Sequence, residues 1–191
     1  MSGPPPGSVR RRHLPAAAAA AGAALLVALV TASPAGAGLA APTVPAGLRP
    51  PAGNTLYLVG HARGYQIYTC QAQQSGYAWV LREPWAGLVD DAGNYVALHY
   101  AGPTWRAPDG SAVVAARIAS APAPSGTAIP WLLLQATSTS GPAGGTFTST
   151  TFIQRINTVG GLAPATGCDA THVGATAAVF YTADYYFYRA G

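Results

Sequence analysis

The sequence predicts an all-β protein: a single-domain sandwich or barrel of about eight or nine short strands joined by long Gly- and Pro-rich loops. Runs rich in β-branched and aromatic residues recur along the chain, and Gly, Pro, Asn or Asp separates most of them. Few stretches have the spacing of apolar residues that an amphipathic helix needs. This combination is typical of sandwiches and barrels.

The first 41 residues have the pattern of a secretory signal peptide with its cleavage region. Residues 10–12 are all arginine, and residues 16–30 are apolar apart from one glycine. This apolar run is shorter than the ~20 residues that a membrane helix needs. Small residues close the segment, with Ala35-Gly36-Ala37 and Leu39-Ala40-Ala41 as candidate cleavage sites. We therefore expect a secreted, extracellular protein with no membrane span after cleavage; a retained anchor is the alternative, and the export route is left open.

Removal of this segment changes the charge of the protein. The whole chain has a formal charge of +4, and loss of the three arginines takes it to +1. A nucleic-acid partner requires a basic patch on the folded domain, so none is expected.

The mature chain then divides into a leader and a domain. Residues 42–53 hold four prolines and predict an extended leader, and residues 54–191 predict one all-β domain. The expected strands are residues 55–59, 65–70, 77–82, 95–100, 112–118, 131–137, 147–157 and 179–189. Turns are expected at 91–94 and 108–111, where Asp and Gly occupy positions that β-turns favour.

The last expected strand carries aromatic residues on both faces. This pattern indicates a central strand covered on both sides, which places Asp184 among aromatic side chains. Since a buried carboxylate needs a partner, Arg155 on the neighbouring long strand is the candidate, and both residues are assigned structural roles.

The chain has two cysteines, Cys70 and Cys168. In an oxidising compartment an isolated pair predicts a disulfide, which leaves neither sulfur free to act as a nucleophile or metal ligand.

Several segments together resemble a known family. They are GYQIYTC at 64–70, HYAGPTW at 99–105 with DGS at 109–111, IPWLL at 129–133, IQRINT at 153–158 with GG at 160–161, GCD at 167–169 and YTADY at 181–185. Their order is similar to that in the secreted bacterial and fungal family known as domain of unknown function 3455, over about residues 42–188. The resemblance implies export, one compact domain and no established activity. Some members carry a malate dehydrogenase label, but this chain has no G-x-G-x-x-G after a strand and no βαβ pattern.

Residues 98–111 are the richest segment for chemistry. A pocket would use Tyr100 and Trp105 as flat apolar walls and polar side chains nearby, including Arg106, to fix a sugar ring or an aromatic ligand. The structural alternative, which we favour, makes the segment a strand, a Gly-Pro corner and a hairpin turn. In that case Trp105 lies in the core and His99 bonds a carbonyl.

Catalysis has weaker support. His99, Asp109 and Ser111 are the candidate catalytic residues, but there is no G-x-S-x-G elbow. Glu83 and Asp184 are the acids least typical of turns and would be the pair for glycoside hydrolysis. The histidines lack metal-ligand spacing, so no metal and no cofactor are predicted.

The first functional hypothesis is therefore a disulfide-linked β-domain that binds a cell-wall glycan or another extracellular ligand without catalysis. The alternative is a small extracellular hydrolase that uses His99 with an acidic partner. The oligomeric state is left undecided.

Overall fold

The computed structural model describes residues 1–3, 7 and 39–191. Nearly all of the expected signal peptide, including its arginines and its apolar run, lies outside the described residues. Within the part of the chain that is described, no helix has the length and apolar character needed to cross a membrane.

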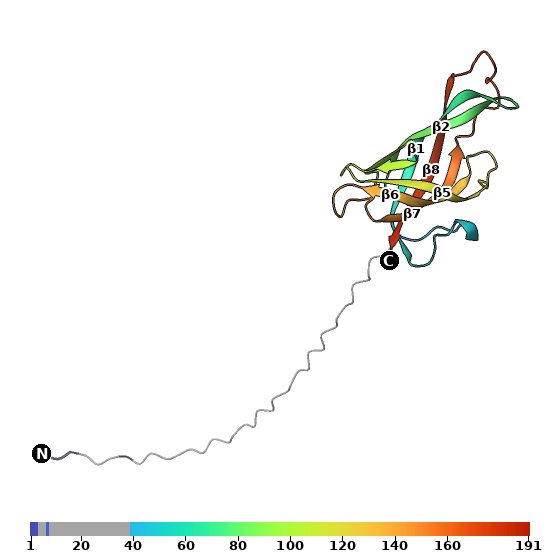
Figure 1. The fold of residues 1–191 in the computed structure, drawn as a ribbon. Coiled ribbons are helices and arrows are strands. Elements are labelled where there is room, and N and C mark those ends of the chain that lie inside the picture. Colours follow the sequence, from blue (N-terminus) through green and yellow to red (C-terminus); the bar gives the residue numbers. More distant parts are fainter. Residues whose placement is uncertain (4–6, 8–38) are drawn as a thin grey trace. The chain divides into compact units, whose positions relative to one another are not determined.

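The described residues form eight strands and one short 3-10 helix. The strands are β1 (Asn54–Gln73), β2 (Gly76–Val89), β3 (Tyr95–Tyr100), β4 (Thr104–Arg106), β5 (Ala112–Ala121), β6 (Trp131–Ser140), β7 (Thr150–Gly160) and β8 (Thr176–Ala190). Each strand pairs with its neighbours in sequence, and β8 pairs antiparallel with β1, which closes a barrel (Figure 1). The all-β prediction is confirmed, and of its two forms the barrel is the one adopted.

Two details of the strands differ from the sequence prediction. The first two expected strands are one strand, because β1 continues through Gly60 and Gly64 for 20 residues. A Cβ on Gly64 would overlap the backbone of Trp85 and Ala86 on β2, so the glycine permits a close approach of two strands. The short strand β4 was not expected; its three residues were assigned to a corner and a turn.

Because consecutive strands are antiparallel, the loops that connect them alternate between the two ends of the barrel. One end, called the sealed end below, holds the connections at 90–94, 107–111 and 141–149. The other, called the cavity end, holds those at 74–75, 101–103, 122–130 and 161–175.

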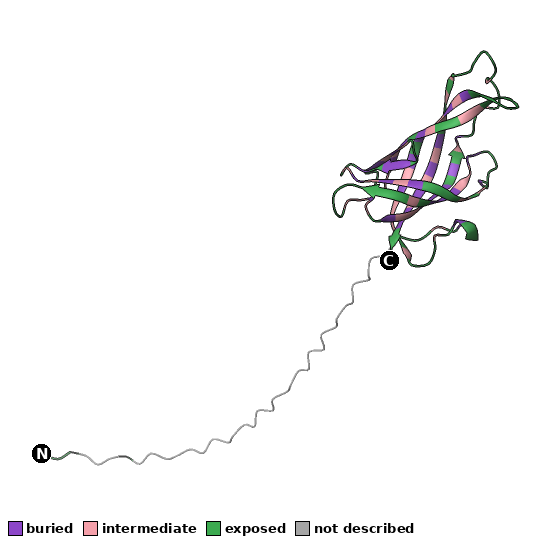
Figure 2. Cartoon of the chain, in the orientation of Figure 1, coloured by how far each residue is buried: buried purple, intermediate pink, exposed green. Residues whose placement is uncertain are grey.

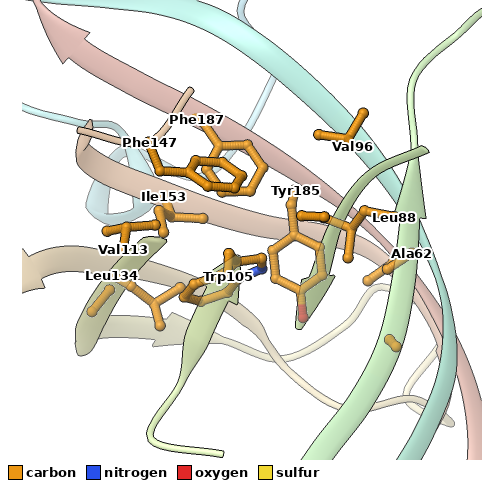
Figure 3. Close-up of a cluster of buried hydrophobic side chains, with 14 of the residues drawn as sticks. Ala62, Leu88, Val96, Trp105, Val113, Leu134, Phe147, Ile153, Tyr185 and Phe187 are labelled. Atoms are coloured by element: carbon orange, nitrogen blue, oxygen red, sulfur yellow. The ribbon is translucent and has the colours of Figure 1, made fainter. Parts of the chain in front are cut away.

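Aromatic and aliphatic side chains fill the interior toward the sealed end (Figure 3). Phe187 lies with its ring centroid 5.0 Å from that of Phe147 and 6.1 Å from that of Trp105. Tyr181, Ala183, Tyr185 and Phe187 from β8 are all buried. The predicted cover on the other face of β8 is incomplete: Phe180 is 47% exposed, and outward-facing residues of this strand remain partly accessible (Figure 2).

The leader packs on the outside of the barrel. It contains the 3-10 helix η1 (Ala46–Leu48), and Val44 and Leu48 form a second apolar cluster with Leu133 and Ile156. Gln154 Nε2 donates a hydrogen bond to Leu48 O at 2.6 Å. This contact holds the leader against β6 and β7.

The predicted disulfide between Cys70 and Cys168 is confirmed. It joins β1 to the loop 161–175. Further hydrogen bonds fix the same loop, from Tyr68 Oη to Gly161 O at 2.6 Å and from Trp79 Nε1 to Thr166 O at 2.8 Å. The loop is therefore held in place at the cavity end.

Candidate ligand-binding cavity

A cavity of about 490 Å³ lies at the cavity end of the barrel. Its wall is largely apolar and comes from all eight strands together with the loops 101–103, 122–130 and 161–175. The lining residues are Gln66, Tyr68, Leu81, Pro84, His99, Pro103, Trp105, Arg117, Ile129, Pro130, Leu132, Leu134, Arg155, Leu162, Ala163 and Tyr185. A closed barrel of eight strands has an interior wide enough to hold one small ligand.

Strand alternation places the polar residues of this wall. Successive side chains of a strand point to opposite faces, so every second residue of β1, β3 and β7 points inward. Gln66, His99 and Arg155 occupy such positions and are at most 9% exposed. Three polar side chains from three strands therefore meet in one interior.

His99 is held as a neutral imidazole. Its Nδ1 lies 2.9 Å from Thr104 O, and its ring stacks on Trp105 with centroids 4.1 Å apart. Because a carbonyl can only accept, Nδ1 carries the proton and Nε2 is left as an acceptor. Burial lowers the pKa of His99 to about 3. The hydrogen bond from His99 to a backbone carbonyl and the burial of Trp105 agree with the structural alternative for residues 98–111.

Arg155 does not pair with Asp184, so this prediction was wrong. Arg155 points into the barrel, and its Nε and Nη2 donate to Pro130 O at 3.3 and 2.8 Å. Asp184 lies on the outer face, where its carboxylate bonds His61 Nδ1 and Asn157 Nδ2, each at 2.7 Å. In the register Arg155 faces Tyr185, the residue after Asp184, and adjacent residues point to opposite faces.

Other polar groups surround the Arg155 guanidinium. Burial raises the pKa of Tyr185, and the positive charge of Arg155 partly opposes that rise. Burial also raises the pKa of Tyr68, again opposed by Arg155. Burial raises the pKa of Tyr181, and the nearby Gln66 side chain partly opposes that rise, although the Gln66 amide nitrogen has no partner in full hydrogen-bond geometry among the described residues. The interior of the cavity thus has a cation and an incompletely bonded amide within an apolar wall.

Tyr100 and Trp105 do not form a shared wall. Trp105 is fully buried and lines the cavity, whereas Tyr100 does not line it. Arg106 is exposed and follows Trp105 on β4, so its side chain points away from the interior. Of the three predicted binding residues, the structure places only Trp105 at the cavity.

Asp109 and Ser111 lie at the opposite end of the barrel from the cavity. Asp109 Oδ1 accepts from Ser111 N and Oγ at 2.7 and 2.6 Å, and Oδ2 accepts from Thr146 N and Oγ1 at 2.7 and 2.8 Å. Ser111 Oγ also accepts from Phe147 N at 3.1 Å. Neither residue bonds His99 in the described structure, so the three catalytic candidates are not brought together.

Sequence reasoning missed most of the cavity. Gln66, Tyr68 and Arg155 stand at alternate positions of strands otherwise rich in apolar residues, and that pattern is the signal that could have identified them. It also missed three exposed aromatic residues on the outer face, where Tyr65 pairs in register with Trp85 and Phe180. The rings of Tyr65 and Phe180 are 76° apart, so they do not form a flat platform.

Comparison with known proteins gives one match. A family model described as "Protein of unknown function (DUF3455)" matches residues 51–189. No curated protein and no solved structure matches the chain.

Proposed function

The chain belongs to the DUF3455 family, whose description assigns no activity, and we propose that it binds a small extracellular ligand in its barrel cavity without catalysis. The cavity itself is the observation that supports this proposal. Its volume of about 490 Å³ falls within the range of small-molecule sites, which combine apolar walls with few placed polar groups.

The polar groups of the cavity suit binding better than catalysis. A general base must be able to take up a proton near the working pH, and the low pKa of the buried His99 opposes this. Its bonded Nδ1 faces a backbone carbonyl rather than an acid. The hydrolase alternative therefore has no support from this geometry.

The nature of the ligand follows from the wall. The expectation of a cell-wall glycan depended on Tyr100 and Trp105 as neighbouring flat surfaces, and Trp105 alone lines the cavity. Aliphatic side chains such as Ile129, Leu132 and Leu134 dominate elsewhere. Since apolar walls bind apolar surface, we propose a ligand with an apolar body in place of a sugar.

Export of the protein is part of the proposal. The N-terminal sequence pattern and the disulfide both support a location outside the cytoplasm. N-terminal sequencing of protein recovered from the culture medium tests this, with a new terminus after residue 37 or 41 as the expected result. Uncleaved protein confined to the cytosol would contradict it.

Fluorescence of Trp105 provides a direct test of binding. The chain has four tryptophans, so replacing Trp79, Trp85 and Trp131 by Phe leaves Trp105 as the single reporter. The neutral probe N-phenyl-1-naphthylamine should accept energy from Trp105 and saturate at one site. Saturable binding without energy transfer from Trp105 would place the probe elsewhere and contradict the cavity.

A matched pair of substitutions locates the probe. Leu134→Phe adds volume to the cavity wall and should weaken binding, whereas Val159→Phe adds the same ring at an exposed position. Equal binding by both variants would count against the cavity.

A glycan screen distinguishes binding in the cavity from binding on the outer face of the barrel. Wall fragments that bind wild type and lose binding in Trp85→Ala, but retain it in Trp105→Phe, would assign the activity to the exposed aromatic residues. The present proposal expects no such fragment.

A further inference from the structure

We infer that the ligand is an amphiphile with a single anionic head group, a carboxylate, which Arg155 binds inside the cavity. This inference deepens the proposed function and rests on it. Three observations support it: the charges of the cavity wall, the hydrogen-bond partners of the six acidic side chains, and the position of Arg155 relative to the mouth of the cavity.

The charged side chains of the cavity wall are all positive. Arg117 and Arg155 line the cavity and no Asp or Glu does. Arg117 is exposed, whereas Arg155 is only 9% exposed. His99 adds no charge, because burial keeps it neutral. An anionic group entering the cavity would meet one buried cation and no carboxylate.

No carboxylate of the chain is available to Arg155. The sequence has six acidic residues, and all lie within the described part of the structure. Each bonds a group away from the cavity: Glu83 bonds Arg82, Asp90 bonds Asn94, Asp91 and Asp184 bond His61, Asp109 bonds Ser111 and Thr146, and Asp169 bonds Thr171 and His172. Arg155 is therefore a buried cation that pairs with no acidic side chain among the described residues.

A buried cation of this kind is costly unless something compensates it. Arg155 donates two hydrogen bonds to Pro130 O and also lies within hydrogen-bonding reach of the Tyr185 hydroxyl, whereas a guanidinium has five N–H donors. A ligand carboxylate would supply the missing negative charge and accept the remaining donors in the planar geometry that guanidinium favours. The amide nitrogen of Gln66, which lies near the Tyr181 hydroxyl, is a further donor in the same wall.

The mouth of the cavity determines how such a ligand lies. Leu81 and Leu162 line the cavity and are 48% and 45% exposed, so they mark its open side. Arg155 is only 9% exposed and pairs in register with Leu132 and Tyr185, which line the same cavity. The head group therefore enters first, and the apolar body lies along Ile129 and Leu132 toward Leu81 and Leu162.

Three probes with one alkyl chain test the inference: decanoate, decanol and decyltrimethylammonium. Titration calorimetry of the wild-type domain should give decanoate about 10- to 100-fold tighter binding than decanol, the range expected for a hydrogen-bonded charge. The cationic probe should bind most weakly. Equal affinities for decanoate and decanol would overturn the inference while leaving the cavity proposal intact. No binding by any probe, together with none by the neutral naphthylamine, would remove the proposed function itself.

Substitution of Arg155 then tests the residue. Arg155→Met should remove the preference for decanoate and leave decanol binding within a few-fold of wild type. Arg106→Met removes an exposed arginine outside the cavity and should keep the preference. Retention of the preference in Arg155→Met would overturn the assignment.

A measurement on the wild-type protein covers the case in which Arg155→Met does not fold. The carboxyl ¹³C resonance of [1-¹³C]decanoate should titrate at lower pH when bound than when free, because a neighbouring cation favours the ionised form. A bound carboxyl pKa equal to or above the free value would overturn the inference.

Discussion

At the sealed end of the barrel the Asp109 carboxylate accepts four hydrogen bonds, whereas at the cavity end the Arg155 guanidinium donates to Pro130 O, lies near the Tyr185 hydroxyl and bonds no carboxylate among the described residues. Asp109 ties the turn 107–111 to the loop 141–149 and leaves no acceptor oxygen without a partner. Satisfied polar clusters hold a fold together, while incompletely satisfied buried groups indicate strain, an unfilled site or a ligand. The difference agrees with a structural role for Asp109 at the sealed end and with the ligand-binding role proposed for the cavity end.

Side-chain packing also differs between the sealed end and the cavity end. Phe147, Phe187 and Trp105 occupy the interior toward the sealed end in mutual contact. On its other side Trp105 lines the cavity. Trp105 therefore lies between closely packed rings and the cavity, and substitutions on either side should have different consequences.

The largest effect is expected from the disulfide. Replacing Cys70 and Cys168 together by Ser should lower the free energy of unfolding by about 4 kcal/mol, because the bridge closes a loop of about 100 residues. Denaturant titration measures the loss. Amide exchange should accelerate in the loop 161–175 and not in 141–149; uniform acceleration would show that the bridge does not act selectively on the cavity end.

A matched pair of leucines compares the two halves directly. Leu88 is fully buried in the core and Leu132 lines the cavity. Leu88→Ala should cost about 3 kcal/mol or more, because it leaves a void in packed surroundings. Leu132→Ala should cost about 1 kcal/mol, since part of its surface already faces empty space. Equal losses in thermal unfolding would mean that the cavity is closed in solution.

Asp109 should give a smaller effect that depends on pH. The hydrogen bonds from Ser111 and Thr146 hold its pKa well below the ordinary value of 3.8. Its contribution to stability is therefore present above pH 3.8 and is lost as the pH falls through the depressed value. Asp109→Asn should melt below wild type at neutral pH, and the difference should narrow in acid. A constant difference across this range would contradict the assigned carboxylate role.

The ionisation of His61 should make stability depend on pH more weakly than that of Asp109, and with the opposite sign. Its hydrogen bonds to Asp91 at 2.8 Å and to Asp184 at 2.7 Å raise its pKa above the ordinary value of 6.5. This contribution is complete below pH 6.5 and disappears as the pH rises through the folded-state pKa. The melting temperature of wild type should converge on that of His61→Gln in this interval. The effect is modest because the His61 side chain is 39% exposed, so solvent screens its ion pairs.

Arg155 should have the smallest effect on stability, in contrast to its effect on binding. Arg155→Met loses the hydrogen bonds to Pro130 O and the interaction with Tyr185 but also removes a buried charge without a carboxylate partner, so the free energy of unfolding should stay within about 1 kcal/mol of wild type. Denaturant titration of the ligand-free protein checks this. A loss comparable to that of Leu88→Ala would make Arg155 a structural residue of the cavity end.

The sequence by itself was sufficient for the all-β class, the family and the cysteine pair. These depend on composition, on strand-like runs between turn residues, and on two sulfurs without other partners. The turn role of Asp109 was also predictable, because its bond to Ser111 N spans only two residues.

Only the tertiary structure decided that the sheet closes and that Gln66, His99 and Arg155 meet in one cavity. Closure depends on the pairing of β1 with β8, strands separated by more than a hundred residues. The pairing of Asp184 was misassigned for the same reason: nothing in the local sequence of β7 and β8 specifies which side of each strand faces inward. Local chemistry determined the strands, and long-range register determined which polar groups share an interior.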